Sequence, residues 1–328
     1  MNEGMVMQGY VHEGYVLKIF DESLWLAKWN IHDNTKNIIA LPWKHKIRNQ
    51  CFVEKINYAK SKYPYLMKVV KPYNRVLPVI SRNHIRKIFD PYEEAKRILR
   101  NPKSYERTVR DLVMLIISEA GIDVDDIGVV HDSAHEPIII SRGKSLAYKI
   151  YNAVRRLFFT TNLFYHLKPE TLFDVEKHDI YVKISNKVLK SLYSRKYLNG
   201  IFGTVFYTIR LLDDSLYNIS DIEVRSFGRV TLIAKILDDK NSIFYPSKYG
   251  VEVTSIAEGS FRAKFVSEIV AFNEGFRETA WEGSEVLVQG VLEKVIDKVN
   301  DREYYRVSVG FSKDLILPLQ RQHIPLYA

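Results

Sequence analysis

The first 45 residues alternate short apolar segments with turns, and no 3.6-residue period persists among them. Runs such as 15–20 and 37–43 are typical of the short strands of a small sheet. Residues 75–87 form a basic stretch with the composition of a loop, and Asp90-Pro91 then opens a helix with proline in its first turn. The pattern therefore predicts a small N-terminal α+β domain over residues 1–89.

The next region changes to a mixed pattern. Helical periods occur at 92–99, 105–120 and about 144–158, and strand-like runs occur at 127–130 and 138–140. Gly121 lies just past the second helical run, where glycine commonly ends a helix. The order strand, turn, strand, helix is typical of a mixed α/β domain, which we predict over residues 90–199.

After Gly200 the apolar positions recur with period two. Strand-like segments between Asp, Asn, Gly and Pro turns lie at 205–212, 230–239, 250–259, 262–272, 284–297 and 304–310. This pattern predicts an all-β C-terminal domain over residues 200–328, either a barrel or a sandwich, and resembles the barrel-type modules that bind single-stranded nucleic acid. The fold class of the whole chain is predicted to be α+β.

Composition narrows the class of protein. Hydrophobic residues make up 46% and charged residues 27%, which fits a folded globular chain. No apolar run approaches the roughly 18 residues of a membrane-spanning helix, and no signal peptide is evident, so we expect a cytoplasmic protein without a membrane partner. The single cysteine, Cys51, forbids an internal disulfide and a thiolate metal cage, and is more typical of a buried or incidental thiol than of a nucleophile.

Positive charge is concentrated in one segment. Residues 141–196 contain twelve Lys/Arg and four Asp/Glu. Such a local surplus attracts polyanions, most commonly nucleic acid, although a solvated Lys-rich helix face would have the same composition. Tyr193 and Tyr197 lie among these cations and could stack on bases or belong to the core. The predicted contacts are Arg142, Lys144, Arg155, Arg156, Lys183, Lys187, Lys190, Arg195 and Lys196.

The segment from His131 to Glu136 contains two imidazoles, two carboxylates and a hydroxyl. His131 and His135 have the i, i+4 spacing of ligands on one helix face, and Asp132 or Glu136 could add oxygen or act as an acid/base pair. The strand before this segment and the proline after it leave little room for a helical turn. We therefore predict a polar turn and no metal site.

Gly143-Lys144-Ser145 invites comparison with a phosphate-binding P-loop. The earlier glycine of that motif is absent, because Ile138 stands at its position. Lys144 and Ser145 could still meet a phosphate at the start of a helix, but an ordinary N-terminal cap is the favoured explanation.

Several segments, taken together, resemble a family of archaeal proteins described as predicted nucleotidyltransferases, related to the DNA polymerase β superfamily. The resemblance covers almost the whole chain in order. Its segments are GYVHEGYVLKIF, VISRNHIRKIFDPYEEAKRIL, GIDVDDIGVV, RKYLNGIFGTVFYTIRLL, NSIFYPSKYGVEV, AFNEGFRETAWEGSEVLVQGVLEKV and YYRVSVG.

The resemblance implies an active site that this chain has altered. Such enzymes place Gly-Ser after one strand to hold a triphosphate and Asp-x-Asp on the next strand to hold two magnesium ions. Here His131-Asp132-Ser133 stands where Gly-Ser is expected, so Ser133 is a degenerate position. Glu136 and Ile138 occupy the two carboxylate positions, and the second carboxylate is therefore missing. Asp174, Glu176 or Asp179 could supply a replacement.

These observations lead to one expected function and two alternatives. We expect a nucleotidyltransferase-like protein that has lost catalysis and binds nucleic acid, RNA or single strands in particular, with no resident metal or cofactor. The first alternative is an active nucleotidyltransferase that uses Mg²⁺ and a nucleoside triphosphate (NTP). The second is a structural subunit of a ribonucleoprotein or protein complex.

Overall fold

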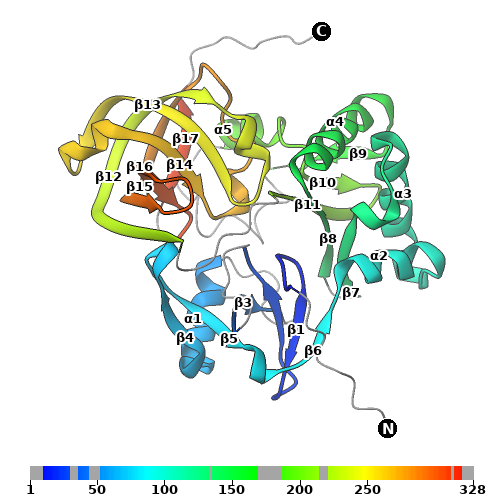
Figure 1. Ribbon diagram of the computed structural model, residues 1–328. Coiled ribbons are helices and arrows are strands. Elements are labelled where there is room, and N and C mark those ends of the chain that lie inside the picture. Colours follow the sequence, from blue (N-terminus) through cyan, green and yellow to red (C-terminus); the bar gives the residue numbers. More distant parts are fainter. Residues whose placement is uncertain are drawn as a thin grey trace. The chain divides into compact units, whose positions relative to one another are not determined.

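The computed structural model describes residues 10–29, 36–43, 52–132, 135–168, 186–213, 221–311 and 314–319. The chain divides into two compact units, Met1–Ile222 and Glu223–Ala328 (Figure 1). Together they contain three sheets and a small number of helices, so the overall α+β class is confirmed. No helix of the described part is long and apolar enough to cross a membrane.

The first unit begins with a six-stranded sheet in the order β4-β5-β3-β2-β1-β6. The strands and the helix of this part of the chain are β1 (Val16–Ile19), β2 (Leu24–Ala27), β3 (Asn37–Pro42), α1 (Phe52–Lys62), β4 (Met67–Val70), β5 (Arg75–Ser81) and β6 (Ile85–Phe89). The expectation of a loop over residues 75–87 is wrong. β5 pairs with both β3 and β4, and β6 pairs with β1, so apolar residues such as Leu77 and Val79 are buried between the basic ones.

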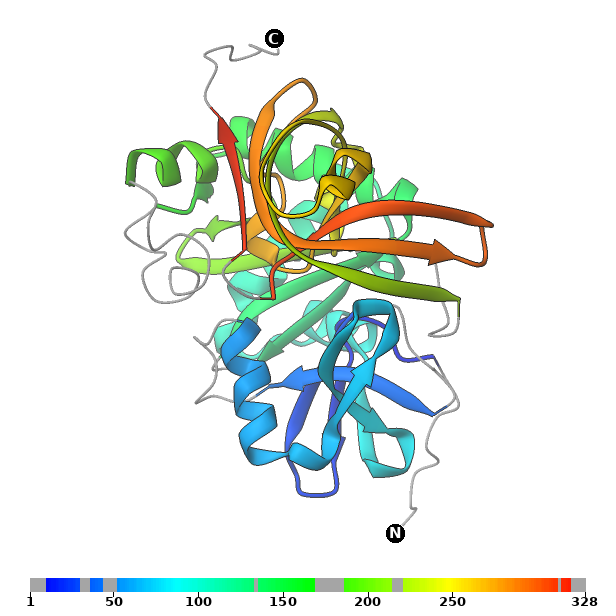
Figure 2. The ribbon, with the colours of Figure 1, turned by 90° about the vertical axis from the view of Figure 1, so that its left-hand side faces the viewer.

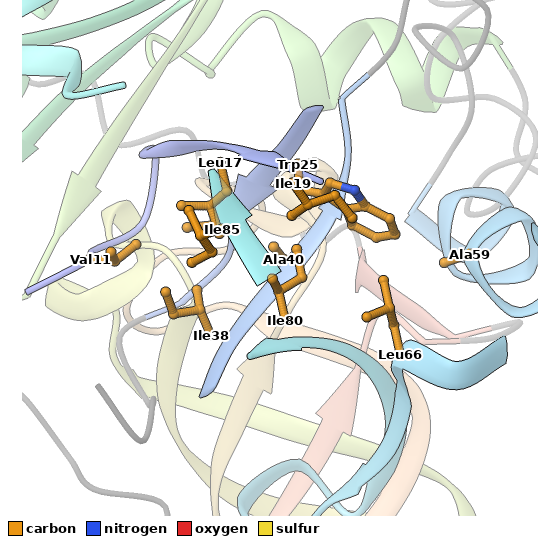
Figure 3. Packing of buried hydrophobic residues seen from close by; sticks show 11 residues of the cluster. Val11, Leu17, Ile19, Trp25, Ile38, Ala40, Ala59, Leu66, Ile80 and Ile85 are labelled. Atoms are coloured by element: carbon orange, nitrogen blue, oxygen red, sulfur yellow. The ribbon is translucent and has the colours of Figure 1, made fainter. Parts of the chain in front are cut away.

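The core of this sheet is a compact apolar cluster (Figure 3). Trp25 is fully buried at its centre, and its indole N–H donates a hydrogen bond of 2.8 Å to the Ser23 hydroxyl. That bond allows a large ring with one polar atom to be buried without losing a hydrogen bond. The strands contribute Leu17, Ile38 and Ile80, and α1 contributes Ala59.

A second, five-stranded sheet follows in the order β7-β8-β11-β10-β9. The helices and strands of this part of the chain are α2 (Pro91–Arg100), α3 (Arg107–Ala120), β7 (Gly128–Asp132), β8 (His135–Arg142), α4 (Lys144–Thr160), β9 (Phe164–His166), α5 (Asn186–Tyr193), β10 (Asn199–Phe202) and β11 (Val205–Leu212). β8 and β11 run parallel, and α4 packs on both and on α3 (Figure 1).

Local sequence determines the ends of the helices here. The Asp90 side chain accepts a 2.8 Å hydrogen bond from the backbone N–H of Tyr92, and Pro91 occupies the first turn of α2. Gly121 has a left-handed φ of 60° and ends α3. The predicted helices at 92–99 and 105–120 are confirmed, as is the strand–turn–strand–helix order of β7, β8 and α4.

β10 and β11 belong to this central sheet, whereas the sequence analysis expected the C-terminal domain to begin at residue 200. The period-two pattern correctly predicts a strand at 205–212, but the pattern of one strand does not show which sheet the strand joins. The pairing of β11 with β8 determines that membership, and the boundary between the compact units follows at Ile222.

The two sheets of the first unit contact each other through residues 12–14. The Glu13 carboxylate accepts a 2.9 Å hydrogen bond from the Arg210 guanidinium, and both side chains are buried. A Cβ on Gly14 would lie 1.8 Å from Cδ1 of Ile140, so only glycine fits at this backbone position, which also has a φ of +91°. Ile140 and Arg210 are paired in the sheet, so the same face of β8 and β11 meets this loop.

The second unit is a small barrel. Its strands are β12 (Ile222–Asp238), β13 (Ser247–Glu258), β14 (Val266–Ala271), β15 (Glu285–Asp297), β16 (Arg302–Val309) and β17 (Leu315–Leu319). They lie in the order β12-β13-β14-β16-β15-β17, and β12 also pairs with β15, so five strands form a closed ring. Figure 2 shows the strong curvature of β12 and β15. The closure decides between the barrel and the sandwich that the sequence left open.

Candidate nucleic-acid interface

The segment from His131 to Glu136 lies at the tip of the β7–β8 hairpin. His131 is on β7 and His135 is on β8, and Asp132 is paired with His135. The two histidines therefore do not share a helix face. Ser133 and the side chain of His135 lie outside the described part of the chain.

The two positions that correspond to paired carboxylates lie in different surroundings. Glu136 is half-buried, whereas Ile138 is only 7% exposed and pairs with Val130 and Thr208 in the middle of the sheet. Ile138 faces the same side of β8 as Ile140, which meets the loop at Gly14. A carboxylate at position 138 would therefore be buried rather than open to a nucleotide.

Among the described residues, no group of three or more His, Cys, Asp or Glu side chains could hold a metal ion. Asp174, Glu176 and Asp179 lie outside the described residues, as does Cys51. The prediction of a polar turn without a metal site at His131 and His135 stays a prediction.

Arg142 and Lys144 lie at the junction of β8 and α4, and both are exposed. The Lys144 ammonium is 3.6 Å from the Asp213 carboxylate. Burial, followed by the charge of Arg142, lowers the pKa of His12 to about 4, so this histidine stays neutral beside the cation. The positive charge at this edge of the sheet therefore comes from Arg142 and Lys144, and His12 adds none.

α4 contains seventeen residues and no acid. Lys149, Arg156 and Phe159 are exposed at spacings of seven and three residues, which places them along one outward stripe of the helix. Phe159 is 76% exposed, the largest exposed fraction among the large apolar side chains of the described part. Arg156 donates to the Glu119 carboxylate at 2.5 Å, an exposed pair that contributes little to stability.

Arg155 lies on the neighbouring side of α4, against aromatic rings. Its guanidinium carbon is 5.7 Å from the ring centre of Tyr151 and 5.5 Å from that of Tyr197. Tyr197 also contacts Phe158 and His166 with ring centres 5.1 and 5.4 Å apart. Burial lowers the pKa of His166, so the imidazole is neutral in this cluster.

The expectation for Lys196 needs correction. Lys196 is 2% exposed, and its ammonium lies 4.7 Å from the ring centre of Tyr193, which is 1% exposed. A lysine and a tyrosine buried in this way do not reach a ligand at the surface, so Tyr193 belongs to the core and Lys196 leaves the candidate interface.

The other predicted cations differ in how exposed they are and in whether the structure describes them. Lys190 is exposed on α5, and Arg195 is half-buried after it. Lys183 and the side chain of Lys187 lie outside the described part. The structure thus brings Arg142 and Lys144 together at one end of α4 and Arg155 and Arg156 near its other end.

Sequence reasoning missed Lys149 and Phe159. Lys149 lies in the same acid-free helix as Lys144, Arg155 and Arg156. It precedes Arg156 by seven residues, about two helical turns, so the two side chains lie on the same side of the helix. Phe159 follows Leu157 and Phe158 in an apolar run, and only the tertiary structure separates this exposed ring from the buried Leu157 and the half-buried Phe158. We call Lys149, Arg156 and Phe159, together with Arg142 and Lys144, the α4 surface.

Comparisons with known proteins give one distant relative. The chain is 23% identical over 252 residues to the uncharacterized protein MJ1086 of Methanocaldococcus jannaschii, a match that covers 68% of this chain and 70% of that protein. No protein family matches the chain, and no solved structure does. The relative is archaeal, which agrees with the archaeal side of the expected resemblance.

Proposed function

We propose that this protein binds nucleic acid, RNA or single strands in preference to a defined duplex sequence, with the α4 surface as a contact. The observation that carries the proposal is the outward face of α4, where Lys149, Arg156 and Phe159 are exposed on a helix without a single acid. Cations that face solvent on one surface pair with phosphates, and an exposed ring offers a base a stacking partner.

The charge distribution supports the same proposal. The segment 141–196 holds twelve of the Lys/Arg residues and four of the acids, and α4 is its longest described helix. Asp213 lies 3.6 Å from Lys144, a separation at which an exposed pair is weak and exchangeable. A phosphate could therefore compete for Lys144.

We further propose that the central region is nucleotidyltransferase-like and has lost catalysis. The support is Ile138, a buried strand residue at the position where the second carboxylate would stand. Two-metal transfer needs both carboxylates, and the loss of one slows it by orders of magnitude. Incubation with Mg²⁺, labelled NTPs and RNA, DNA or protein acceptors tests this. Nucleotide addition that disappears in Glu136→Gln would show that catalysis survives.

The binding proposal is tested by fluorescence anisotropy with a labelled single strand across a salt series. Arg142→Ala/Lys149→Ala should weaken binding and reduce the salt slope, by about 1.4 for two lost phosphate contacts on a single strand. Lys60→Ala/Lys62→Ala on α1 is the matched control, because both lysines are exposed and lie on another helix. An equal loss in both double variants would mean that only total charge matters, and would remove the α4 surface as a site.

A further inference from the structure

The barrel carries a second surface where aromatic and basic side chains meet. Its members come from three separate segments: β12, the short 3-10 helix Phe261–Phe265 between β13 and β14, and β16. We call it the barrel patch, and its residues are Phe227, Phe261, Arg262, Lys264, Phe265 and Tyr305.

The rings and cations of the barrel patch form one connected set. The ring centre of Tyr305 lies 5.9 Å from that of Phe227 and 6.2 Å from that of Phe265. The Arg262 guanidinium carbon is 4.8 Å from the Phe227 ring centre and 5.7 Å from that of Phe261. The Lys264 ammonium is 4.8 Å from the ring centre of Phe265. The distances from Arg262 and Lys264 to the rings are within the range of cation–π attraction.

These aromatic rings are not placed there by the core. Phe261 and Phe265 are 67% and 55% exposed, and within their 3-10 helix only Ala263 is buried. Two exposed phenylalanines within five residues are unfavourable in water for an isolated chain, and exposed apolar groups that gather on one surface mark interaction sites. Burial in the core therefore does not explain why the 3-10 helix Phe261–Phe265 contains two phenylalanines. Contact with a ligand would explain them.

The charge at the barrel patch points to an anion. Among the residues that the structure describes, neither Arg262 nor Lys264 forms an ion pair. The rest of the unit is not basic, since residues 223–328 contain 14 Lys/Arg and 15 Asp/Glu. Two unpaired cations beside exposed rings are therefore a local arrangement, and not a consequence of a generally basic surface.

We propose that the barrel patch is a second nucleic-acid site and binds a single strand, with bases stacked on Phe261 and Phe265 and phosphates paired with Arg262 and Lys264. A single strand offers both a flat apolar face and a negative charge at each nucleotide, which matches alternating rings and cations. A duplex hides the faces of its bases and would meet only the two cations. The inference extends the proposed function to the second compact unit and gives that site its ligand class.

The test uses the full chain and a fluorescein-labelled oligouridine of about 15 nucleotides, long enough for one barrel-sized site. Phe261→Leu/Phe265→Leu keeps apolar volume and removes both aromatic faces. Because one stacked base contributes a factor of roughly 5 to 100, the double variant should bind at least about tenfold more weakly, with an unchanged salt slope. Phe261→Tyr/Phe265→Tyr should retain binding, because the aromatic faces remain.

The cations are tested separately. Arg262→Ala/Lys264→Ala should reduce the salt slope by about 1.4, as expected for two phosphate contacts with a single strand. Lys235→Ala and Leu237→Ala are the matched controls, because both residues are exposed on β12 outside the barrel patch, and neither should change affinity or slope. Circular dichroism and thermal melting confirm that each variant is folded.

The outcomes separate this proposal from the proposed function. If the wild-type chain binds the strand and the α4 variants weaken it while the leucine variant binds normally, the barrel patch is not a site and the proposed function stands. If the leucine variant weakens binding and the α4 variants do not, the barrel patch is the site and the α4 surface is not. No binding by the wild-type chain overturns both, and equal affinity for a duplex of the same length overturns the stacking part.

Discussion

The central region and the barrel reach a similar kind of surface from opposite compositions. In the central region the sequence is strongly basic, but several cations are already used: Lys196 is buried, Arg156 is bonded to Glu119, and Lys144 lies near Asp213. In the barrel the composition is close to neutral, and yet Arg262 and Lys264 stand together over exposed rings.

The number of charged residues in a segment and the charge on its surface are therefore different quantities. A local surplus of Lys and Arg in the sequence indicates that a positive surface potential can exist. Ion pairing and burial decide how many of those charges are exposed to solvent. A cluster assembled from β12, the 3-10 helix Phe261–Phe265 and β16 leaves no trace in a sequence window, because Phe227 and Tyr305 are far apart along the chain and adjacent only in space.

The largest expected effect concerns two buried ion pairs, Glu13–Arg210 in the first unit and Glu293–Arg306 in the second. Arg210→Met leaves Glu13 buried with only part of its partners, and should lower the free energy of unfolding of the first unit by about 3–5 kcal/mol. Arg306→Met should do the same in the barrel, where Arg306 donates to Glu293 at 2.9 Å. Urea unfolding followed by tryptophan fluorescence checks this, because Trp25, Trp29 and Trp43 report on the first unit and Trp281 on the second.

Each variant should shift only the transition of its own unit. The control is Glu293→Met/Arg306→Met, which removes both charges and should recover most of the lost stability. A single shared transition in all variants would show that the two units unfold together and would weaken the comparison between them.

The second prediction is a difference in acid sensitivity. The pKa of His12 is about 4 in the folded chain and 6.5 when exposed, so the unfolded state binds a proton that the folded state does not. The stabilisation is therefore complete above pH 6.5 and is lost as the pH falls toward 4, by about 1–3 kcal/mol. Unfolding of the first unit measured between these pH values should show this loss, and His12→Gln should reduce it, while His166, whose pKa burial also lowers, should keep its own contribution.

The barrel provides the internal reference for this experiment, because no histidine occurs in its described residues. Its transition should not show a comparable histidine step over the same range. A first unit whose stability is flat between pH 6.5 and 4 would contradict the neutral, buried state of His12.

The third prediction separates composition from exposure within the basic segment. Lys149→Ala should weaken binding of a single strand severalfold and reduce the salt slope by about 0.7, since one phosphate contact is lost. Lys196→Met removes the same formal charge from a buried position and should leave the slope unchanged. Anisotropy titrations of the two variants at several salt concentrations check the difference, and a lower slope with Lys196→Met would restore that lysine to the interface.

The smallest effect is expected at the pair between Arg156 and Glu119. Glu119→Gln should change the free energy of unfolding by less than about 1 kcal/mol, because the pair is exposed. The same change frees Arg156 for a phosphate and should raise the affinity for a single strand slightly. Thermal melting and anisotropy measure the two parts, and a weaker affinity would show that Glu119 positions Arg156 for binding.

The sequence predicted the elements of the central region well because local rules determine them. Asp90 and Pro91 begin α2, Gly121 ends α3, and the apolar period of each helix is visible in the chain. It failed at residues 75–87, where β5 has a continuous buried run at 77–80 and β6 has two adjacent exposed basic residues, Arg86 and Lys87. The basic residues on either side of the buried run gave this segment the composition of a loop, because exposed positions of a strand accept any soluble residue.

The candidate surfaces were predicted only in part. Arg142, Lys144, Arg155 and Arg156 were found from a charge count, while Lys149 and Phe159 were not. The barrel patch could not have been found from a count, since its unit has no excess of positive charge.

The α+β class, the positions of most helices and strands, and the segment in which positive charge accumulates all follow from the amino-acid sequence. These are properties of neighbours along the chain, where periodicity, caps and composition act over a few residues. The tertiary structure alone decided that β11 joins β8, that β12 closes the barrel against β15, and that Lys196 is buried while Phe261 is exposed. Those outcomes depend on contacts between distant segments, whose free energy no local pattern records.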